Sequence, residues 1–196
     1  KTLITAEERM RPILEQSARE KQTRLVGVDW LDSGLLTEDV LDRFPYQEHP
    51  ANVALVLELA SQLQIEPDFA LTEMADRVVP DLGVLKAFPR ATQKGRTLEF
   101  NNGMSANERI ATLGNWQRMG FDDEDRVKEP GVLVSTLVNN RADRVSRSRV
   151  FASMLIEDLS ADLHVLIGTN LTGLLGYIQE AWEDFIRQSL SRAEED

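Results

Sequence analysis

After Gly95 the chain alternates between short apolar runs and longer segments in which apolar residues recur at helical spacing. The apolar runs have the length of strands, and the segments between them have the length of helices. This order, repeated three times, predicts parallel strands joined by right-handed crossovers. The predicted strands cover residues 97–101, 132–138 and 163–167, and the predicted helices cover residues 106–119, 143–159 and 171–193. The fold class is therefore predicted to be α/β, with a mostly parallel, Rossmann-like sheet flanked by helices.

The first half of the chain predicts a separate set of elements. Thr5 and Glu8 have the spacing of a capping box, which predicts a helix from there to about Gln22. Further predicted elements are a strand over residues 24–28, a helix that begins at His49 and carries an apolar stripe to Leu63, a helix over residues 69–78, and an extended connector over residues 81–93. Pro50 and Pro67 stand where a helix usually begins.

The 196 residues are enough for one good core, or for one domain with an appendage. We interpret residues 1–33 as the end of a preceding domain. Residues 34–94 are then a linker and helical segment, and residues 95–196 are the Rossmann-like domain.

Charge and residue usage exclude several classes of function. The 22 basic and 33 acidic side chains give a net charge of −11, which argues against nucleic-acid binding. The absence of Cys excludes disulfides and thiolate chemistry. With His49 and His164 as the only histidines, no metal-binding residue is predicted. No apolar stretch approaches the roughly 20 residues needed to span a bilayer.

Two polar clusters, Asn102–Glu108 and Asn139–Arg144, lie where a predicted strand gives way to a predicted helix. In open α/β sheets, ligands bind at the carboxyl ends of the strands, so we expect the two clusters to converge on one crevice. Helix N-termini and Arg side chains favour a phosphate or a carboxylate there.

Each candidate motif has a structural alternative. Ser105 could cap the helix, with Asn107 in its first turn and no ligand. Arg141, Arg144 and Arg147 are three residues apart, so a helical continuation places them on one face. Asp143 would cap that helix or hold one of the arginines, and the alternative is a surface with intrahelical ion pairs. A lone His at a helix start is more often a local hydrogen-bonding residue than a catalyst.

No phosphate-binding P-loop motif occurs in the chain, so the main phosphate cradle of any ATP chemistry lies elsewhere. Neither a Ser/His/Asp triad nor a pair of catalytic carboxylates can be argued from the sequence. No catalytic residue is therefore predicted.

Three segments together resemble the ATP-dependent amide ligases of poly-γ-glutamate synthesis, which are related to Mur ligases and folylpolyglutamate synthetases. The segments are Phe44–Ala54, Asn102–Glu108 with Thr112 and Trp116, and Asn139–Arg144. The first cluster looks like that family's N-G-F-A-A-N-D, with Met104 for Phe, Ser105 for Ala and Glu108 for Asp. The similarity runs over residues 1–185 and covers the second half of such an enzyme.

The resemblance implies a Mur-type architecture. Its central P-loop ATPase domain would end within residues 1–33, and its C-terminal Rossmann-like domain would close over the nucleotide and present the incoming amino acid. The family's reaction activates a γ-carboxylate as an acyl phosphate, which the amine of the next glutamate attacks. The implied nucleotide-binding residues are His49, Asn52, Asn102 and Asn107, and the implied substrate-binding residues are Asn140, Arg141, Asp143 and Arg144. ATP and Mg²⁺ would be bound mainly by the part of the enzyme missing from this chain. This chain alone would therefore be inactive.

The implied partners are the N-terminal P-loop half of the same enzyme, glutamate and poly-γ-glutamate, and membrane subunits of the synthase, with homo-oligomerisation left open. The implied localisation is cytoplasmic, at the inner face of the cell membrane through partners. Two other hypotheses stay open. One is a non-catalytic module that binds a polyanion or regulates a partner enzyme, and the other is a Mur-type ligase with another amino-acid substrate.

Overall fold

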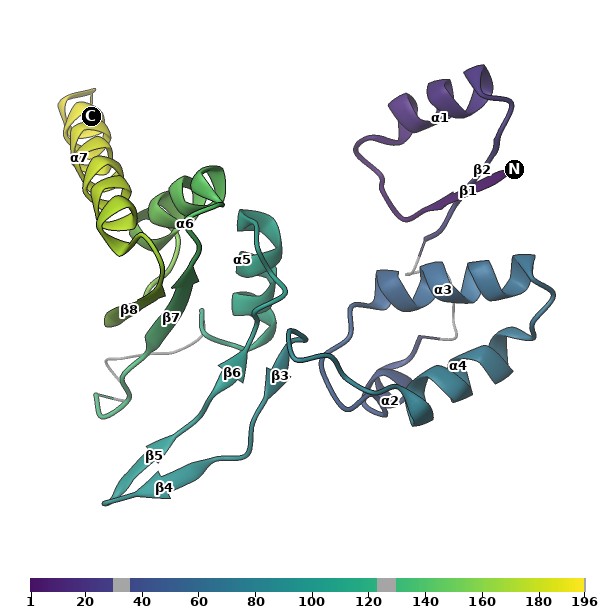
Figure 1. The fold of residues 1–196 in the computed structure, drawn as a ribbon, viewed down its shortest axis with the longest axis horizontal. Coiled ribbons are helices and arrows are strands. Elements are labelled where there is room, and N and C mark those ends of the chain that lie inside the picture. The colour runs from purple at the N-terminus through teal and green to yellow at the C-terminus, as the bar shows by residue number, and fades with distance from the viewer. Residues whose placement is uncertain (30–35, 123–129, 196) are drawn as a thin grey trace. The chain divides into compact units, whose positions relative to one another are not determined.

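The computed structural model describes residues 1–29, 36–122 and 130–195 (Figure 1). Within these residues the protein is a mixed α/β structure with seven helices and eight strands, which pair into four two-stranded sheets. The chain divides into two compact units, Lys1–Asn102 and Gly103–Asp196. The domain boundary predicted after residue 33 lies outside the described residues.

The first unit begins with a parallel strand pair joined by a helix. Its elements are β1 (Thr2–Thr5), α1 (Arg11–Glu20) and β2 (Arg24–Gly27). The predicted β2 is confirmed, but the predicted capping box is wrong, because Thr5 ends β1 and its hydroxyl accepts from the backbone N–H of Glu7 at 3.0 Å. The helix begins at Arg11, with Pro12 in its first turn, where a missing N–H costs nothing.

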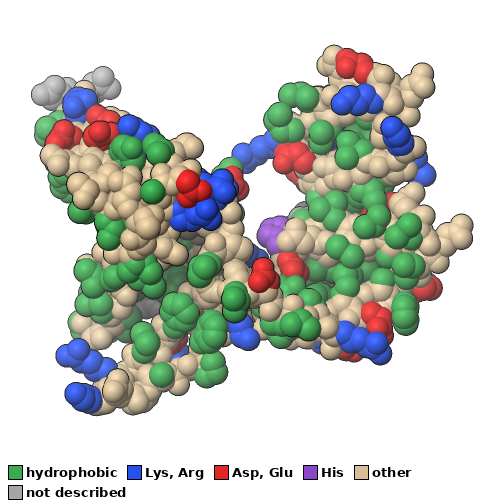
Figure 2. All heavy atoms as spheres, viewed as in Figure 1, with side chains coloured by type: hydrophobic (Ala, Val, Ile, Leu, Met, Phe, Trp, Pro, Cys, Tyr) green, Lys and Arg blue, Asp and Glu red, His purple; other side chains and the backbone are tan. Residues whose placement is uncertain are grey.

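A small helical core follows in the first unit. It contains α2 (Glu38–Leu41), α3 (Pro50–Gln62) and α4 (Pro67–Arg77), and its buried side chains are Phe44, Val53, Leu57, Leu71 and Ala75. The prediction of helices α3 and α4 is confirmed. Figure 2 shows hydrophobic side chains at the surface of this helical part as well. Leu59 of α3, Leu63 just after it and Phe69 of α4 are exposed.

The first unit ends in an antiparallel ribbon. Its strands are β3 (Lys86–Ala87), β4 (Ala91–Gln93), β5 (Arg96–Leu98) and β6 (Asn101–Asn102); β4 pairs with β5, and β3 pairs with β6. Lys94 and Gly95 both have positive φ, as the two-residue turn of a twisted hairpin requires. The predictions of a parallel strand over residues 97–101 and of a connector over residues 81–93 are therefore wrong, and the predicted boundary after residue 94 falls inside this turn.

The second unit contains a strand–helix–strand arrangement. Its elements are α5 (Arg109–Arg118), β7 (Ser135–Asn140), α6 (Val145–Glu157), β8 (Leu163–Gly168) and α7 (Leu171–Glu195). Strands β7 and β8 are parallel, with Ser135 opposite Leu163 and Asn140 opposite Gly168. The predicted crossover through α6 is confirmed for two strands, and a Rossmann-like relationship stays a prediction.

Helix α6 packs against the first part of α7. Met154 and Leu174 are fully buried, and the Arg149 guanidinium lies 4.2 Å from the centre of the Tyr177 ring. At the C-terminal end of α6, the guanidinium of Arg109 from α5 lies 2.9 Å from the Glu157 carboxylate and 2.7 Å from the Asp158 carboxylate. This arginine offsets two carboxylates at a helix C-terminus, where negative charge is unfavourable. None of the described helices has the length and apolar character needed to cross a membrane.

Candidate functional site

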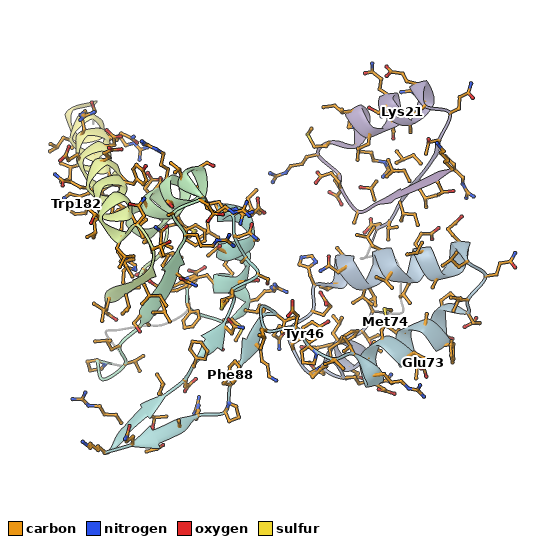
Figure 3. All side chains as sticks on the ribbon, viewed as in Figure 1. Lys21, Tyr46, Glu73, Met74, Phe88 and Trp182 are labelled. Atoms are coloured by element: carbon orange, nitrogen blue, oxygen red, sulfur yellow. The ribbon has the colours of Figure 1, made fainter. Side chains whose placement is uncertain are left out.

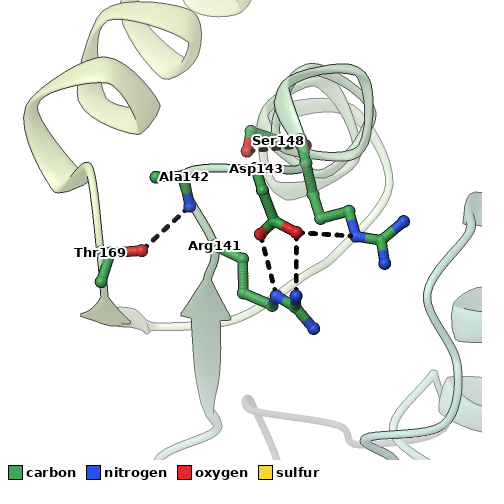
Figure 4. Close-up of polar contacts among 6 residues, drawn as sticks. Arg141, Ala142, Asp143, Ser148 and Thr169 are labelled. Carbon is green, nitrogen blue, oxygen red and sulfur yellow. Dashed lines mark hydrogen bonds and ion pairs between the residues drawn. The ribbon is translucent and has the colours of Figure 1, made fainter.

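Hydrogen bonds of Asn140 and Thr169 join the carboxyl ends of β7 and β8. The buried Asn140 amide donates to the carbonyls of Thr169 (2.7 Å) and Asn170 (3.4 Å), and its Oδ1 accepts from the Ser148 hydroxyl at 2.7 Å. The Ala142 N–H donates to the Thr169 hydroxyl at 2.9 Å (Figure 4). The side chain of Asn140 is thus satisfied within the protein and fixes the turn that follows β7.

Arg141 and Arg144 share one carboxylate in that turn. The Arg141 guanidinium binds Asp143 through two hydrogen bonds of 3.0 and 2.9 Å, and Arg144 approaches the same carboxylate at 3.4 Å (Figure 4). The hydrogen bond from Arg141 lowers the pKa of Asp143. The prediction that Asp143 holds the arginines is confirmed.

The alternative, that Asp143 caps the helix, is wrong. Arg144 is the N-cap of α6, and its side chain forms no capping hydrogen bond. Because the helix begins at Val145, Arg141 precedes it, so the predicted row of Arg141, Arg144 and Arg147 on one helix face does not form.

An open pocket of about 370 Å³ brings the first cluster beside the first turns of α6. Its lining residues are Asn107, Glu108, Ser146, Arg147 and Val150. The predicted convergence of the two polar clusters is therefore confirmed in part. The first cluster lies beside α6, which is the helix that follows the second cluster. Ser146 and Val150 were missed, since no sequence signal shows which α6 residues face α5.

The start of α5 differs from the predicted cap at Ser105. Glu108 is the N-cap residue, and its carbonyl accepts from the Thr112 hydroxyl at 2.8 Å. The Asn107 amide donates to the Ser105 carbonyl at 3.1 Å, which orients Asn107 at the edge of the pocket. The prediction that Ser105 caps this helix is wrong.

The other predicted nucleotide-binding residues lie in the first unit. The Asn102 amide donates to the carbonyls of Leu82 (2.6 Å) and Val84 (3.3 Å). His49 is the N-cap of α3, and its Nδ1 accepts from the Ala51 N–H at 3.2 Å. The local hydrogen bond expected of a histidine at a helix start is therefore present.

Glu48 organises the segment before α3. One of its carboxylate oxygens accepts from the His49 N–H at 2.8 Å and from the Asn52 amide at 2.9 Å. Tyr46, labelled in Figure 3, also forms a side-chain hydrogen bond with Glu48. The sequence drew attention to His49 and Asn52, whereas Glu48 is the residue that joins them.

We expect the phenol of Tyr46 to titrate well above the ordinary range. Burial, followed by the hydrogen bond and the charge of Glu48, raises its pKa from 10.0 to about 12. Because the folded-state pKa is raised, the corresponding stability is complete below pH 10 and is lost as the pH rises through about 12. Phenolate absorbance should show this late step, and Tyr46→Phe should remove it while Tyr177→Phe leaves it. A late step that survives Tyr46→Phe would contradict the assignment.

Ser148→Ala should lower the free energy of unfolding by about 1–3 kcal/mol, because it leaves the buried Oδ1 of Asn140 without its donor. Urea denaturation followed by circular dichroism measures this loss. Ser146→Ala, an exposed change on the same helix, should alter stability by less than about 0.5 kcal/mol. Equal effects of the two changes would contradict the role given to Asn140.

The described residues contain no group of three or more His, Asp or Glu side chains that could hold a metal ion. No metal ion is therefore assigned to them.

Comparison with known proteins shows the family of this chain. Residues 87–194 match the model of the poly-gamma-glutamate synthase CapB C-terminal domain. The chain belongs to this family. The matched range contains the two polar clusters, the pocket, all of α5 and α6, and α7 up to residue 194.

Two curated proteins are similar to this member of the CapB C-terminal domain family. PGA synthase CapB of Bacillus subtilis (strain 168) is 28% identical over 169 residues, which are 85% of this chain and 40% of the relative. Capsule biosynthesis protein CapB of Bacillus anthracis is 27% identical over 166 residues, which are 85% of this chain and 34% of the relative. The chain thus spans less than half the length of either relative, and no solved structure matches it.

Proposed function

We propose that this chain is the closing and acceptor-binding half of an ATP-dependent amide ligase that polymerises glutamate through γ-carboxyl linkages. Membership in the CapB C-terminal domain family and the name of the relative PGA synthase CapB support a role in poly-γ-glutamate synthesis. The observation that carries the acceptor-binding role is the pocket between the start of α5 and the first turns of α6.

The lining of this pocket suits a free amino acid. Arg147 and Ser146 can hold a carboxylate, and Glu108 and the Asn107 carbonyl oxygen can accept hydrogen bonds from an ammonium group. Val150 supplies apolar surface for the methylene groups between them. A dicarboxylate without an amine would leave Glu108 facing a negative charge, so the pocket favours an amino acid over its deaminated analogue.

In this proposal the pocket orients the attacking amine. As the nitrogen forms the new C–N bond, the C–O bond to phosphate breaks and the phosphate leaves with one of the two protons that an ammonium nitrogen gives up on becoming an amide. The other proton must leave before the attack. Glu108 is the anionic group of the pocket and is assigned to accept that proton. ATP, held with Mg²⁺ mainly by the other half of the enzyme, supplies the phosphoryl group that activates the γ-carboxylate.

The residues around β7 have supporting roles in the same proposal. The hydrogen bonds of Asn140 favour positioning over direct contact with substrate. Arg141 and Arg144, held by Asp143, present positive charge beside the start of α6 and are assigned to the anionic part of the substrate. His49, Asn52 and Asn102 keep the proposed nucleotide role. Asn107, for which the resemblance also implies a nucleotide role, is assigned in this proposal to the acceptor amine, because it lines the pocket.

The proposal includes an N-terminal P-loop half, membrane subunits of the synthase and a cytoplasmic location. A related ligase with another amino-acid substrate uses the same pocket chemistry, because every free amino acid carries the same two charged groups. The identity of the substrate is therefore decided by direct competition between amino acids.

Glutamate incorporation by the complete enzyme tests the proposal. Asn107→Ala and Arg141→Ala should each lower the rate of incorporation about tenfold or more, because each removes a polar contact to a charged substrate. Gln117→Ala, an exposed change on α5, serves as the control and should leave the rate unchanged. Wild-type rates in both Asn107→Ala and Arg141→Ala would refute the acceptor-binding role.

A further inference from the structure

Helix α7 is much longer than the helix against which it packs. It has 25 residues and α6 has 13, so at 1.5 Å per residue α7 is longer by roughly 18 Å. The contacts to Arg149 of α6 come from Tyr177 and Glu180, in the first part of α7. Figure 1 shows the other end of α7 extending past α6.

A row of exposed apolar side chains runs along α7 from its first part into the part that extends past α6. Leu175, Trp182, Ile186 and Leu190 are separated by seven, four and four residues, which places them along one side of the helix. Their exposed fractions are 55%, 50%, 38% and 62%. Phe185 lies beside this row and stacks on Trp182, which Figure 3 labels, with ring centres 6.1 Å apart. An exposed apolar row of this kind marks an interaction surface.

The charges beside the row identify an occupant. Glu183 and Arg187 are four residues apart on one flank of the row. When two copies of the helix pair in antiparallel orientation about a twofold axis near Phe185, Glu183 of each copy lies level with Arg187 of the other. Parallel pairing would instead place like charges level with each other, so the attraction exists only in the antiparallel arrangement.

The same charges disfavour a lipid surface. Helices that lie on anionic membranes carry Lys and Arg on the polar face. Between Leu171 and Ala193, α7 carries three acidic residues, Glu180, Glu183 and Asp184, against two basic ones, Arg187 and Arg192, and the whole chain has a net charge of −11.

We propose that α7 mediates self-association of this chain, in which Trp182, Ile186 and Leu190 pack against the same residues of a second copy running in the opposite direction. Trp182 of each copy then packs between Ile186 and Leu190 of the other. Glu183 and Arg187 form two equivalent ion pairs, one on each side of the twofold axis. This inference concerns a surface outside the pocket and is independent of the proposed reaction.

Sedimentation of the full 196-residue chain over a wide range of concentrations tests the proposal. The wild-type chain should change reversibly from one copy to two as the concentration rises. Ile186→Glu should lower the mass at high concentration twofold, to that of a single copy, with helix content unchanged by circular dichroism. Ser191→Glu adds the same charge on the polar side of α7 and should leave the dimer intact.

A charge exchange tests the antiparallel orientation. Glu183→Arg should weaken the dimer, and the double change Glu183→Arg with Arg187→Glu should restore it, because the exchanged charges again meet as opposites. A single-copy mass at every concentration, or a dimer unaffected by Ile186→Glu, would overturn the proposal. So would binding of a single-copy chain to vesicles of phosphatidylcholine and phosphatidylglycerol, detected by sedimentation of the chain with the vesicles.

Discussion

Gly168→Ala is expected to lower the stability of the second unit by more than about 4 kcal/mol, enough to prevent its folding. Gly168 ends β8 with φ at +98°, a conformation that side chains rarely adopt. A Cβ at this position would overlap the backbone oxygen of Asn140 and lie 2.5 Å from Oδ1 of Asn139. The overlapping backbone belongs to the neighbouring strand and cannot move without breaking the turn that carries Arg141. Urea denaturation and amide NMR dispersion measure the loss.

Gly176→Ala provides the matched control for this prediction. Gly176 lies within α7, and a Cβ there would have no neighbouring atom within 4 Å. Replacing it should stabilise the unit by about 0.5–1 kcal/mol, through the higher helix propensity of Ala. Comparable stability of Gly168→Ala and Gly176→Ala would contradict the geometry assigned to the ends of β7 and β8.

Arg147→Gln should raise the KM for the proposed acceptor amino acid about 10- to 100-fold in the complete enzyme, since it removes the charged hydrogen bond that we propose between Arg147, which lines the pocket, and the substrate carboxylate. The kcat should change much less, because the same contact is present in the bound ground state and in the transition state. Steady-state kinetics with varied glutamate at saturating ATP separate the two parameters.

Arg192→Gln makes the same change in charge in the last turn of α7, outside the pocket, and should leave the KM for glutamate unchanged. Equal effects of Arg147→Gln and Arg192→Gln would indicate a general electrostatic effect in place of a contact. An unchanged KM in Arg147→Gln would remove Arg147 from the acceptor site.

The elements that could be predicted from the sequence are those whose pattern of apolar residues extends over many positions. Helices α6 and α7 and strands β7 and β8 carry apolar residues at a regular period over many positions, so their type and order could be predicted. The ribbon of β3 to β6 could not, because its strands have two or three residues and few are apolar. Their pairing depends on the turn at Lys94 and Gly95, which was not predicted from the sequence.

The site was predictable as a region but not as a set of contacts. The polar clusters drew attention to Asn107 and Arg141 because polar residues follow apolar runs there. Sequence alone could not show that Asn140 is buried and already hydrogen-bonded by Ser148, since that depends on how α6 returns over β7. Arg147 lies in the first turn of α6, which begins at Val145, and lines the pocket. Its place in the pocket depends on where this helix begins.

An amide NMR titration of this chain with glutamate, and separately with glutarate, tests most directly whether the pocket receives an amino acid. Glutarate keeps two carboxylates but lacks the amine, so it measures the contribution of Glu108 to recognition. We predict saturable shifts at Asn107, Glu108, Ser146 and Arg147 with glutamate and much weaker ones with glutarate. Shifts confined to residues outside the pocket, or equal responses to the two ligands, would contradict the acceptor site proposed for this chain.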